Sequence, residues 1–277
     1  MKASIPELIE KSKWLRKELF EMIIRPKRGH IPSSYSAVEV VNSLFYGGVM
    51  NFDPKRPDWS ERDRFIISKG HAAMVLYPVL ADLGYYDTEA VPKFASKDAL
   101  LRMYADPSIP GIEAVAGSLG HGLGIGAGYA LSAKKDGQDY TSYVMLGDGE
   151  CYEGSVWESA MFAAHYKLDN LVTIVDRNQL CIMGTTEECL SQGDLRAKFD
   201  AFGWDAQSID GHSYEEIFAA IEKTKEKNGK PKAIIANTVK GKGISFMEKQ
   251  PLWHNRMPNP EQTEKARAEL ENNPIVG

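Results

Sequence analysis

The fold class of this chain is decided by residues 142–178, which read SYVMLGDGECYEGSVWESAMFAAHYKLDNLVTIVDRN. Two apolar runs, 142–146 and 171–175, have the length of buried strands, and each ends in polar residues. Between them, residues 153–166 have helical periodicity, with Val156, Ala160 and either Ala163 or Ala164 on one face. This order predicts a βαβ unit with parallel strands and a right-handed crossover.

Apolar patterns extend this unit in both directions along the chain. We expect helices at 7–24, 36–45, 72–83 and 214–227, a helix ending near residue 135, and strands at 64–68 and 232–237. Residues 25–34 read as an irregular polar loop, and the tail after Pro251 as a surface segment or one that reaches toward a partner. Together these elements predict an α/β fold, a doubly wound parallel sheet with helices on both faces.

Composition excludes several classes of protein. The chain has 277 residues and a net charge of −5, so an electrostatic attraction to nucleic acid or acidic membranes has no support. No segment has the apolar length of a membrane span, and the N-terminus lacks the apolar block of a signal peptide. Three cysteines (Cys151, Cys181 and Cys189) without CxxC spacing read as reduced core thiols of a cytoplasmic protein.

Polar residues follow both strands of the βαβ unit. Asp148 comes directly after the first strand, and Asn178 lies just beyond the second. In parallel sheets these ends meet at one edge, where ligands bind. A carboxylate and an amide oxygen there suit magnesium, which usually shares its coordination with phosphate oxygens. Gly147 and Gly149 allow phosphates to approach the backbone. The residues therefore predict a metal-bridged diphosphate ligand.

Both groups of glycines have a second interpretation. An isolated GDG occurs most often in a simple turn, but here a strand-end asparagine accompanies it one crossover later. The run GSLGHGLGIGAG, residues 117–128, does not meet the G-x-G-x-x-G pattern and follows no convincing strand, which disfavours a nicotinamide cofactor. Closely packed backbone at the start of a helix explains these glycines better.

Residues 147–180 resemble the thiamine-diphosphate motif of transketolases, which opens with GDG and closes on Asn. The resemblance covers nearly the whole chain and includes RGHIPSSYSAVEV, DRFIISKGHAAMVLY, GIEAVAGSLGHGLGIGAGYALSAK and VKGKGISFMEKQPLWH. It implies that residues 1–277 form a single domain that binds the diphosphate of thiamine diphosphate, with Mg²⁺ or another divalent cation such as Ca²⁺ or Mn²⁺.

The resemblance also implies roles for individual residues. It makes Asp148, Asn178 and the carbonyl of Leu180 the metal ligands. It gives cofactor-contacting positions as Ser33, His71, Gly117, Ser118, Leu119, Gly149, Glu153, Asn178, Lys240 and His254. His30, His71 and His254 correspond to catalytic histidines, with His30 facing the substrate. Glu153 also matches an acidic residue at the subunit interface that links paired active sites.

The other histidines have plainer interpretations. His165 and His212 read as structural, and His212 is expected near the start of a helix at Tyr214. His121 stands where related sequences often have Gln, and the sequence leaves open whether it lines the pocket or starts the following helix.

The transketolase resemblance implies a missing half. The family's second domain binds the aminopyrimidine ring and supplies the glutamate that activates the cofactor, and this chain ends before that domain begins. We therefore expect a partner chain, the C-terminal transketolase subunit with the pyrimidine-binding domain, in an α2β2 assembly.

One departure from the family bears on the substrate. The usual Gly-His-Pro before GSLG is absent, and Asp106-Pro107 in MYADPSIPGIE is the nearest equivalent. Ile31-Pro32 after His30 also differs from the usual Pro-Gly. The ketose donor is thus open, and a branched or sulfonated sugar fits this pattern.

The sequence is compatible with three functions. The first is a transketolase subunit that moves a two-carbon ketol unit from a phosphorylated or otherwise anionic ketose to an aldose. The second is a related carboligase that resembles deoxyxylulose-phosphate synthase, which the late Trp253-His254 pair disfavours. The third is a cofactor-binding subunit without turnover, which the full set of histidines disfavours.

Overall fold

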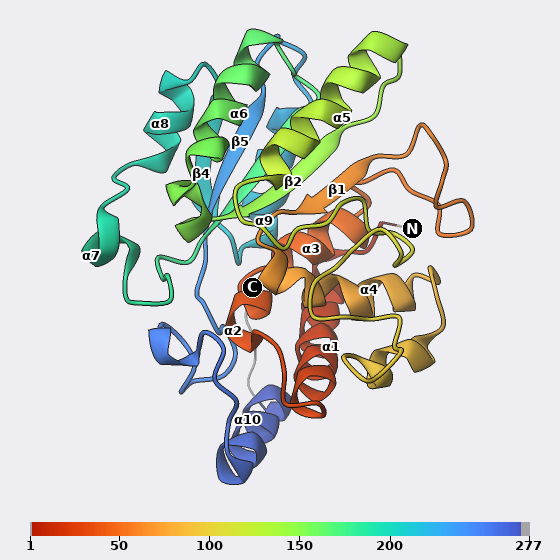
Figure 1. The fold of residues 1–277 in the computed structure, drawn as a ribbon, viewed down its shortest axis with the longest axis vertical. Coiled ribbons are helices and arrows are strands. Elements are labelled where there is room, and N and C mark those ends of the chain that lie inside the picture. Colours follow the sequence, from red (N-terminus) through yellow and green to blue (C-terminus); the bar gives the residue numbers. More distant parts are fainter. Residues whose placement is uncertain (1, 273–277) are drawn as a thin grey trace.

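The computed structural model describes residues 2–272, and its core is a five-stranded parallel sheet with the order β1-β2-β3-β5-β4. The strands are β1 (Arg64–Ile67), β2 (Ser142–Gly147), β3 (Leu171–Arg177), β4 (Asp205–Asp210) and β5 (Lys232–Asn237). The predicted α/β class with a doubly wound parallel sheet is confirmed (Figure 1).

The βαβ unit read from residues 142–178 is present. Strands β2 and β3 pair in parallel, from Ser142 opposite Leu171 to Gly147 opposite Asp176. Between them runs α6 (Gly154–His165), which buries Val156, Ala160 and Ala163 as its periodicity predicts. Because Gly147 and Asp176 lie side by side, the residues that follow them start from the same edge of the sheet.

Alternation along the strands divides the interior into two cores. In β2, Val144 and Leu146 pack with α5 (Gly122–Asp136), α6 and α8 (Leu195–Ala201) on one face. Tyr143 and Met145 point to the other face, which is covered by α1 (Ile5–Ile24), α3 (Val38–Phe45) and α9 (Tyr214–Thr224). Figure 1 shows these two helical layers on either side of the strands.

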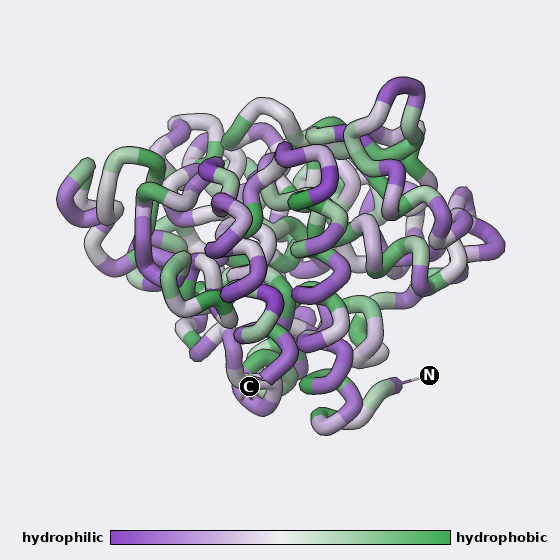
Figure 2. Tube along the Cα trace, turned by 90° about the horizontal axis from the view of Figure 1, so that it is seen from below, coloured by the Kyte–Doolittle hydropathy of each residue, from purple (hydrophilic) through white to green (hydrophobic). Residues whose placement is uncertain are grey.

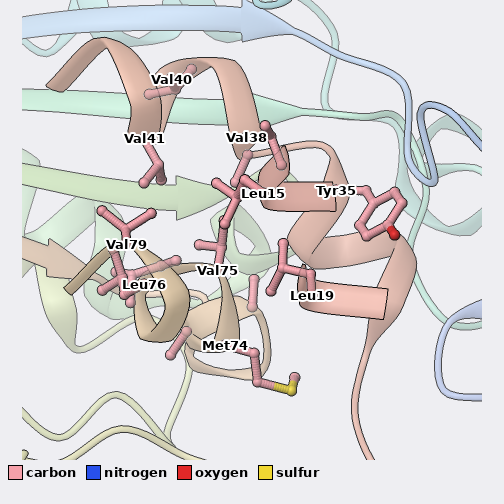
Figure 3. Close-up of a cluster of buried hydrophobic side chains, with 14 of the residues drawn as sticks. Leu15, Leu19, Tyr35, Val38, Val40, Val41, Met74, Val75, Leu76 and Val79 are labelled. Atoms are coloured by element: carbon pink, nitrogen blue, oxygen red, sulfur yellow. The ribbon is translucent and has the colours of Figure 1, made fainter. Parts of the chain in front are cut away.

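The core beneath the second face is built largely from the N-terminal part of the chain. Figure 3 shows Leu15 and Leu19 of α1 directed at apolar side chains from α3 and from α4 (Leu76–Asp82). These side chains are at most 2% exposed. The hydrophobic effect of this burial stabilises the packing of α1, which leads into the segment that carries His30 and Ser33.

Three boundaries differ from the sequence prediction. The expected irregular loop at 25–34 contains a short helix, α2 (Ile31–Tyr35), with Pro32 in its first turn. Residues 70–75 form a 3₁₀ helix, so the α-helix expected over 72–83 begins only at Leu76. Residues 117–121 of the glycine-rich run precede α5, whereas residues 122–128 form the first turns of this helix.

Several further elements escaped prediction. β4 is an edge strand with mostly exposed or half-buried residues, so its sequence DAQSID lacks a strand pattern. The expected surface tail contains α10 (Pro260–Asn272), which buries Ala266 and Leu270. The shorter helical segments are η2 (Thr88–Lys93), η3 (Gly149–Tyr152), α7 (Thr186–Leu190) and η4 (Pro251–Trp253).

Polar residues dominate the outer turns of the chain, as Figure 2 shows from below. Among residues 2–272, no helix combines the length and the apolar character needed to cross a membrane.

Candidate active site

The carboxyl ends of β2 and β3 bring Asp148 and Asn178 together. The amide of Asp148 donates to the carbonyl of Asp176 at 3.2 Å, so the two loops leave the sheet as neighbours. Both Asp148 and Asn178 are buried, at 2% and 8% exposure. The predicted convergence of a carboxylate and an amide oxygen at this edge is therefore present.

Backbone donors orient the Asp148 carboxylate. Its Oδ1 accepts from the amide of Gly149 at 2.8 Å, and its Oδ2 accepts from the amide of Gln179. Gln192 Nε2 donates to the Asp148 carbonyl at 2.6 Å. The carboxylate is thereby fixed, and each oxygen keeps a lone pair for a further partner.

The loop after β3 brings the Leu180 carbonyl to the cavity that Asp148 and Asn178 also line. Gln179 has a φ of 63°, a left-handed conformation that bends the chain between Asn178 and Leu180. Asn178 Oδ1 accepts from the amide of Leu180 at 3.2 Å. The Leu180 carbonyl accepts from Lys240 Nζ at 3.2 Å, so its oxygen faces a cationic group in the cavity.

The charges around this point favour an ionic ligand. Burial, reinforced by Asp176, raises the pKa of Asp148 to about 6. Burial lowers the pKa of Lys240 to about 8, although Asp148 opposes that shift. A cation would stabilise the buried carboxylate and an anion the buried ammonium, so a metal-bound phosphate suits both groups.

The donor set fits a hard cation that shares its coordination with a ligand. Asp148, Asn178 and the Leu180 carbonyl offer oxygen atoms only, the preference of Mg²⁺. Within residues 2–272, no group of three or more His, Cys, Asp and Glu side chains could hold a metal ion. Mg²⁺ held by few protein ligands usually shares its coordination with phosphate oxygens, which fits this set of donors.

A cavity of about 640 Å³ opens above this edge, large enough for a cofactor-sized molecule. It brings together most of the residues chosen from the sequence. Those in its wall are His30, Ser33, His71, Gly117, Leu119, Asp148, Gly149, Asn178, Leu180, Lys240 and His254.

Three histidines from distant segments meet in this cavity. The ring centroids of His30 and His71 are 5.3 Å apart, those of His30 and His254 5.2 Å, and those of His71 and His254 5.3 Å. His30 precedes α2, His71 lies in η1 (Gly70–Val75) and His254 follows η4. The sheet and the N-terminal helices thus collect three imidazoles on one side of the cavity.

The imidazoles are held in their neutral form. Burial lowers the pKa of His30 and, assisted by Lys69, lowers that of His71 well below its usual range. Burial and then Lys240 lower the pKa of His254 to about 3. A neutral imidazole can accept or donate a proton at either nitrogen, which suits the hydroxyl groups of a sugar.

Two residues of the cavity wall carry a buried polar atom without a partner in the described part of the chain, Ser33 Oγ and His30 Nδ1. An unpaired buried polar atom is costly, so these atoms point to a bound molecule. Lys240 Nζ contacts His254 Nδ1 at 3.0 Å and takes part in none of the ion pairs formed within residues 2–272. Its charge is available for a ligand.

Two segments that line the cavity, one with His71 and one with Gly117 and Leu119, pack closely against each other at Gly70. A Cβ at this position would lie 1.6 Å from the carbonyl oxygen of Ala116, which no adjustment of a side chain could relieve. The absence of a side chain at Gly70 lets η1 approach the segment that carries Gly117 and Leu119.

Other residues chosen from the sequence lie outside the cavity wall. Ser118 is exposed beside it, and Glu153 is exposed at the start of α6. His121 stands at the start of α5, the second of its two open roles. His165 lies at the end of α6. His212 has the expected structural role, although Ser213 rather than His212 caps α9.

The segment that replaces Gly-His-Pro contributes a different residue from the one expected. The Asp106 carboxylate accepts from the amide of Ser108 at 2.8 Å and pairs with Arg102 at 3.1 Å, away from the cavity wall. Tyr104 lines the cavity instead and is 47% exposed.

Sequence reasoning missed three buried charged residues that build the site, Lys69, Asp176 and Glu150. Lys69 Nζ forms an ion pair with Asp176 and donates to the carbonyl of Ser33 at 2.9 Å. Glu150 accepts from the amides of Gly120 at 2.8 Å and Gly147 at 3.0 Å. The signal that could have found them is a charged residue within each of the segments KGH, VDRN and GDGE.

The cysteines are only partly as expected. Cys151 is a buried core thiol, whereas Cys181 is half-buried and Cys189 exposed. The prediction that all three belong to the core is therefore wrong for Cys181 and Cys189, because the segment after Leu180 runs along the cavity rim.

The chain is similar to known proteins over most of its length. The family described as "Transketolase, thiamine diphosphate binding domain" matches residues 11–275. An apulose-4-phosphate transketolase subunit from Phocaeicola vulgatus is 42% identical over 255 residues, 92% of this chain and 90% of that protein. A 6-deoxy-6-sulfo-D-fructose transketolase subunit from Clostridium sp. is 41% identical over 258 residues, 93% of this chain and 94% of that protein.

Solved structures show the same fold over nearly the whole chain. The transketolase of Campylobacter jejuni superposes with a TM-score of 0.91 at 31% identity, over 99% of this chain and 44% of its own length. That of Leishmania mexicana superposes with a TM-score of 0.88 at 26% identity, over 99% of this chain and 42% of its own length. The chain thus spans less than half the length of these solved relatives.

Proposed function

Because the chain belongs to the transketolase family through its thiamine-diphosphate-binding domain, we propose that it is the diphosphate-binding subunit of a two-chain transketolase. Relatives matched over 90%, 97% and 94% of their length are named transketolase subunits. The word subunit in those names supports a second chain. The observation that carries the proposal is the cavity in which three histidines face Asp148, Asn178 and Lys240.

The metal and the diphosphate would lie at the ends of β2 and β3. Asp148, Asn178 and the Leu180 carbonyl would hold Mg²⁺ or a similar divalent cation. The Gly149 amide and the Lys240 ammonium would contact the diphosphate. This assignment is supported by the raised pKa of Asp148, the lowered pKa of Lys240 and the oxygen-only donor set.

The rings of the cofactor would extend from there toward the histidines. Gly117, Ser118 and Leu119 would line the aminopyrimidine and thiazolium, and Ser33 Oγ would find there the partner that it lacks. His71 and His254 would sit over the cofactor near its diphosphate. Glu153, exposed at the start of α6, would face the subunit interface.

Thiamine diphosphate supplies the carbanion chemistry that breaks and forms the carbon–carbon bond in ketol transfer. The chain's own part is to bind, to exclude water and to move protons. His30, His71 and His254, neutral near pH 7, would take and return protons at the hydroxyl groups of the ketose and the aldose. The burial that lowers their pKa values also keeps bulk water away from these transfers.

We propose that the remaining parts of the active site come from a partner chain. A C-terminal subunit with the pyrimidine-binding domain would supply the activating glutamate, with two copies of each chain forming an α2β2 enzyme. Residues 1–277 would then be one diphosphate-binding domain. Free thiols in the described structure agree with a cytoplasmic enzyme.

The donor would be a ketose that carries an anionic group, a phosphate or a sulfonate. Two relatives are named for apulose 4-phosphate and 6-deoxy-6-sulfo-D-fructose. The loop that replaces Gly-His-Pro places Tyr104 rather than a histidine at the cavity, which changes the hydrogen bonding available to the sugar.

The experiment is to tag the chain in its native cell, isolate the complex and assay ketol transfer with thiamine diphosphate and Mg²⁺ from a set of anionic ketoses. We expect a co-purifying second chain, with activity in the mixture and none in either chain alone. Full activity of the isolated chain, or none in an intact complex with any ketose of the set, would overturn the proposal.

A further inference from the structure

Two of the three cysteines lie together at the rim of the cavity. Cys181 Sγ and Cys189 Sγ are 3.1 Å apart, and both residues line the cavity wall. They are eight positions apart in the sequence, on either side of a tight turn that leads into α7. A disulfide has a sulfur–sulfur distance of about 2.05 Å, so an approach of roughly 1 Å would complete the bond.

The backbone holds this pair in place. The amide of Cys181 donates to the carbonyl of Gly184 at 3.0 Å, and the amide of Cys189 donates to the carbonyl of Thr185 at 3.1 Å. A capping box between Thr185 and Glu188 fixes the first turn of α7. The two thiols therefore face each other because the turn is ordered by its own hydrogen bonds.

Access differs between the two thiols. Cys189 is exposed and Cys181 is half-buried, whereas Cys151 is fully enclosed and its Sγ contacts the Gly147 carbonyl at 3.5 Å. Oxidation of thiols follows access and the presence of a neighbouring thiol that can resolve the first product. Of the three cysteines, only the pair at the rim meets both conditions.

We propose that Cys181 and Cys189 form a redox modification site that closes reversibly into an intramolecular disulfide at the rim of the cofactor cavity. The oxidant is a low-molecular-weight disulfide of the glutathione class. The Cys189 thiolate attacks it, its sulfur–sulfur bond breaks and one small thiol leaves. The Cys181 thiolate then attacks the Cys189 sulfur of the mixed disulfide and releases the second small thiol. Two protein thiols lose two electrons in total, and two small thiols carry away the electrons and protons.

The bond would constrain a segment that forms part of the cavity. Cys181 follows Leu180 directly, and the enclosed turn carries Ile182 and Met183, which also line the cavity although they are 68% and 86% exposed. A ligand in the cavity would cover the thiols that face it. This consequence rests on the proposed function: bound thiamine diphosphate with Mg²⁺ slows formation of the disulfide.

The test uses the full chain equilibrated in glutathione redox buffers, followed by alkylation, intact mass measurement and peptide mapping. We expect the wild type to lose two hydrogens and to yield a Cys181–Cys189 linked peptide that dithiothreitol reverses. Cys151→Ser should behave like the wild type. Cys189→Ser and Cys181→Ser should form no intramolecular link. A link that includes Cys151, or only mixed disulfides with glutathione in the wild type, would overturn the proposal.

A second readout separates this inference from the proposed function. Oxidation rates are compared with and without thiamine diphosphate and Mg²⁺, in the complex with its partner, after calorimetry has measured cofactor binding. Slower oxidation with bound cofactor supports the coupling. An unchanged oxidation rate with bound cofactor contradicts only the proposed slowing of disulfide formation by the cofactor, and not the redox site itself. Absence of cofactor binding in a complex that still forms the disulfide would contradict the proposed function and leave the redox site standing.

Discussion

Glu39 and His212 are 173 positions apart in the sequence, yet His212 Nδ1 lies 2.8 Å from Glu39 Oε2. The other ring nitrogen of His212 accepts from the amide of Val239 at 2.8 Å. Arg16 binds Glu39 at 2.7 Å and also donates to the carbonyl of Lys242 at 2.9 Å. This buried network therefore fixes the backbone on both sides of Lys240, whose side chain lines the cavity.

The Glu39 network makes stability depend on pH. Burial alone would raise the pKa of Glu39, but Arg16 and His212 overcome it and hold the pKa at about 2, below the ordinary 4.5. Because the folded-state pKa is lowered, this contribution is fully present well above pH 4.5 and is lost as pH falls toward 2. The difference corresponds to ~3 kcal/mol. Glu39→Gln should flatten the dependence of unfolding free energy on pH in this window, measured by urea unfolding.

The same variant leaves the Arg16 guanidinium buried without its carboxylate, so we expect it to lose ~3–5 kcal/mol at neutral pH. Glu222→Gln removes an exposed pair with Lys225 and should change the unfolding free energy by less than ~0.5 kcal/mol. Parallel pH curves for Glu39→Gln and the wild type would show that Glu39 does not titrate in this way.

The Lys69–Asp176 pair gives a second stability prediction. Both side chains are almost fully buried, and Asp176 also accepts from Ser36 Oγ at 2.7 Å. Asp176→Asn leaves a buried ammonium without its counter-charge and should cost ~3–5 kcal/mol in denaturant unfolding. Adding Lys69→Met should restore part of that loss, because no unpaired charge remains. A double variant less stable than Asp176→Asn would contradict this account.

Two glycines of α5 make a matched pair. A Cβ at Gly126 would lie 2.2 Å from Val144 Cγ2 of β2, whereas a Cβ at Gly128 would meet nothing within 4 Å. Gly126→Ala should therefore destabilise the chain by ~1–3 kcal/mol through overpacking. Gly128→Ala should stabilise it by ~0.5–1 kcal/mol through helix propensity. Thermal unfolding of both variants checks the contrast, and equal effects would contradict the close packing of α5 on β2.

The histidine cluster predicts a separation of binding from turnover. In the complex with the partner, His30→Asn should lower the kcat of ketol transfer by about 10²–10⁴, the range of general acid–base catalysis, and leave cofactor binding unchanged. His165→Asn, outside the cavity wall, is the control and should retain kcat. A similar kcat loss in both variants would argue against a specific role for His30.

The fold was predictable where one residue pattern had one explanation. The apolar runs of β2 and β3 and the spacing of Val156 and Ala160 on α6 specify the βαβ unit, and the structure confirms it. The edge strand β4 was not predictable, since a strand with only Ile209 buried has no alternating pattern. The helix α10 was hidden because its polar residues resemble a surface tail.

For the site, the chemistry of each motif could be predicted from the sequence, but the position of one motif relative to another in the fold mostly could not. Asp148 and Asn178 could be paired because parallel strands end at one edge. The meeting of His30, His71 and His254 depends on loops whose paths no local pattern describes. The contact between Cys181 and Cys189 follows a turn closed by the hydrogen bond from the Cys181 amide to the Gly184 carbonyl, a local conformation that the sequence pattern did not predict.

The most direct test of the account is cofactor binding at the metal site. The complex of the chain with its partner is stripped of metal with EDTA and titrated with thiamine diphosphate, with and without Mg²⁺, for the wild type, Asp148→Asn and Asp58→Asn. Asp58 is exposed and lies outside the cavity wall, so its variant is the matched control.

We predict Mg²⁺-dependent binding in the wild type and in Asp58→Asn. In Asp148→Asn we predict at least a ~100-fold weaker affinity, because even residues that only orient metal ligands cost ~10–100-fold. Binding by Asp148→Asn as tight as by the wild type, with the same dependence on Mg²⁺, would contradict the placement of the cofactor at this edge of the sheet.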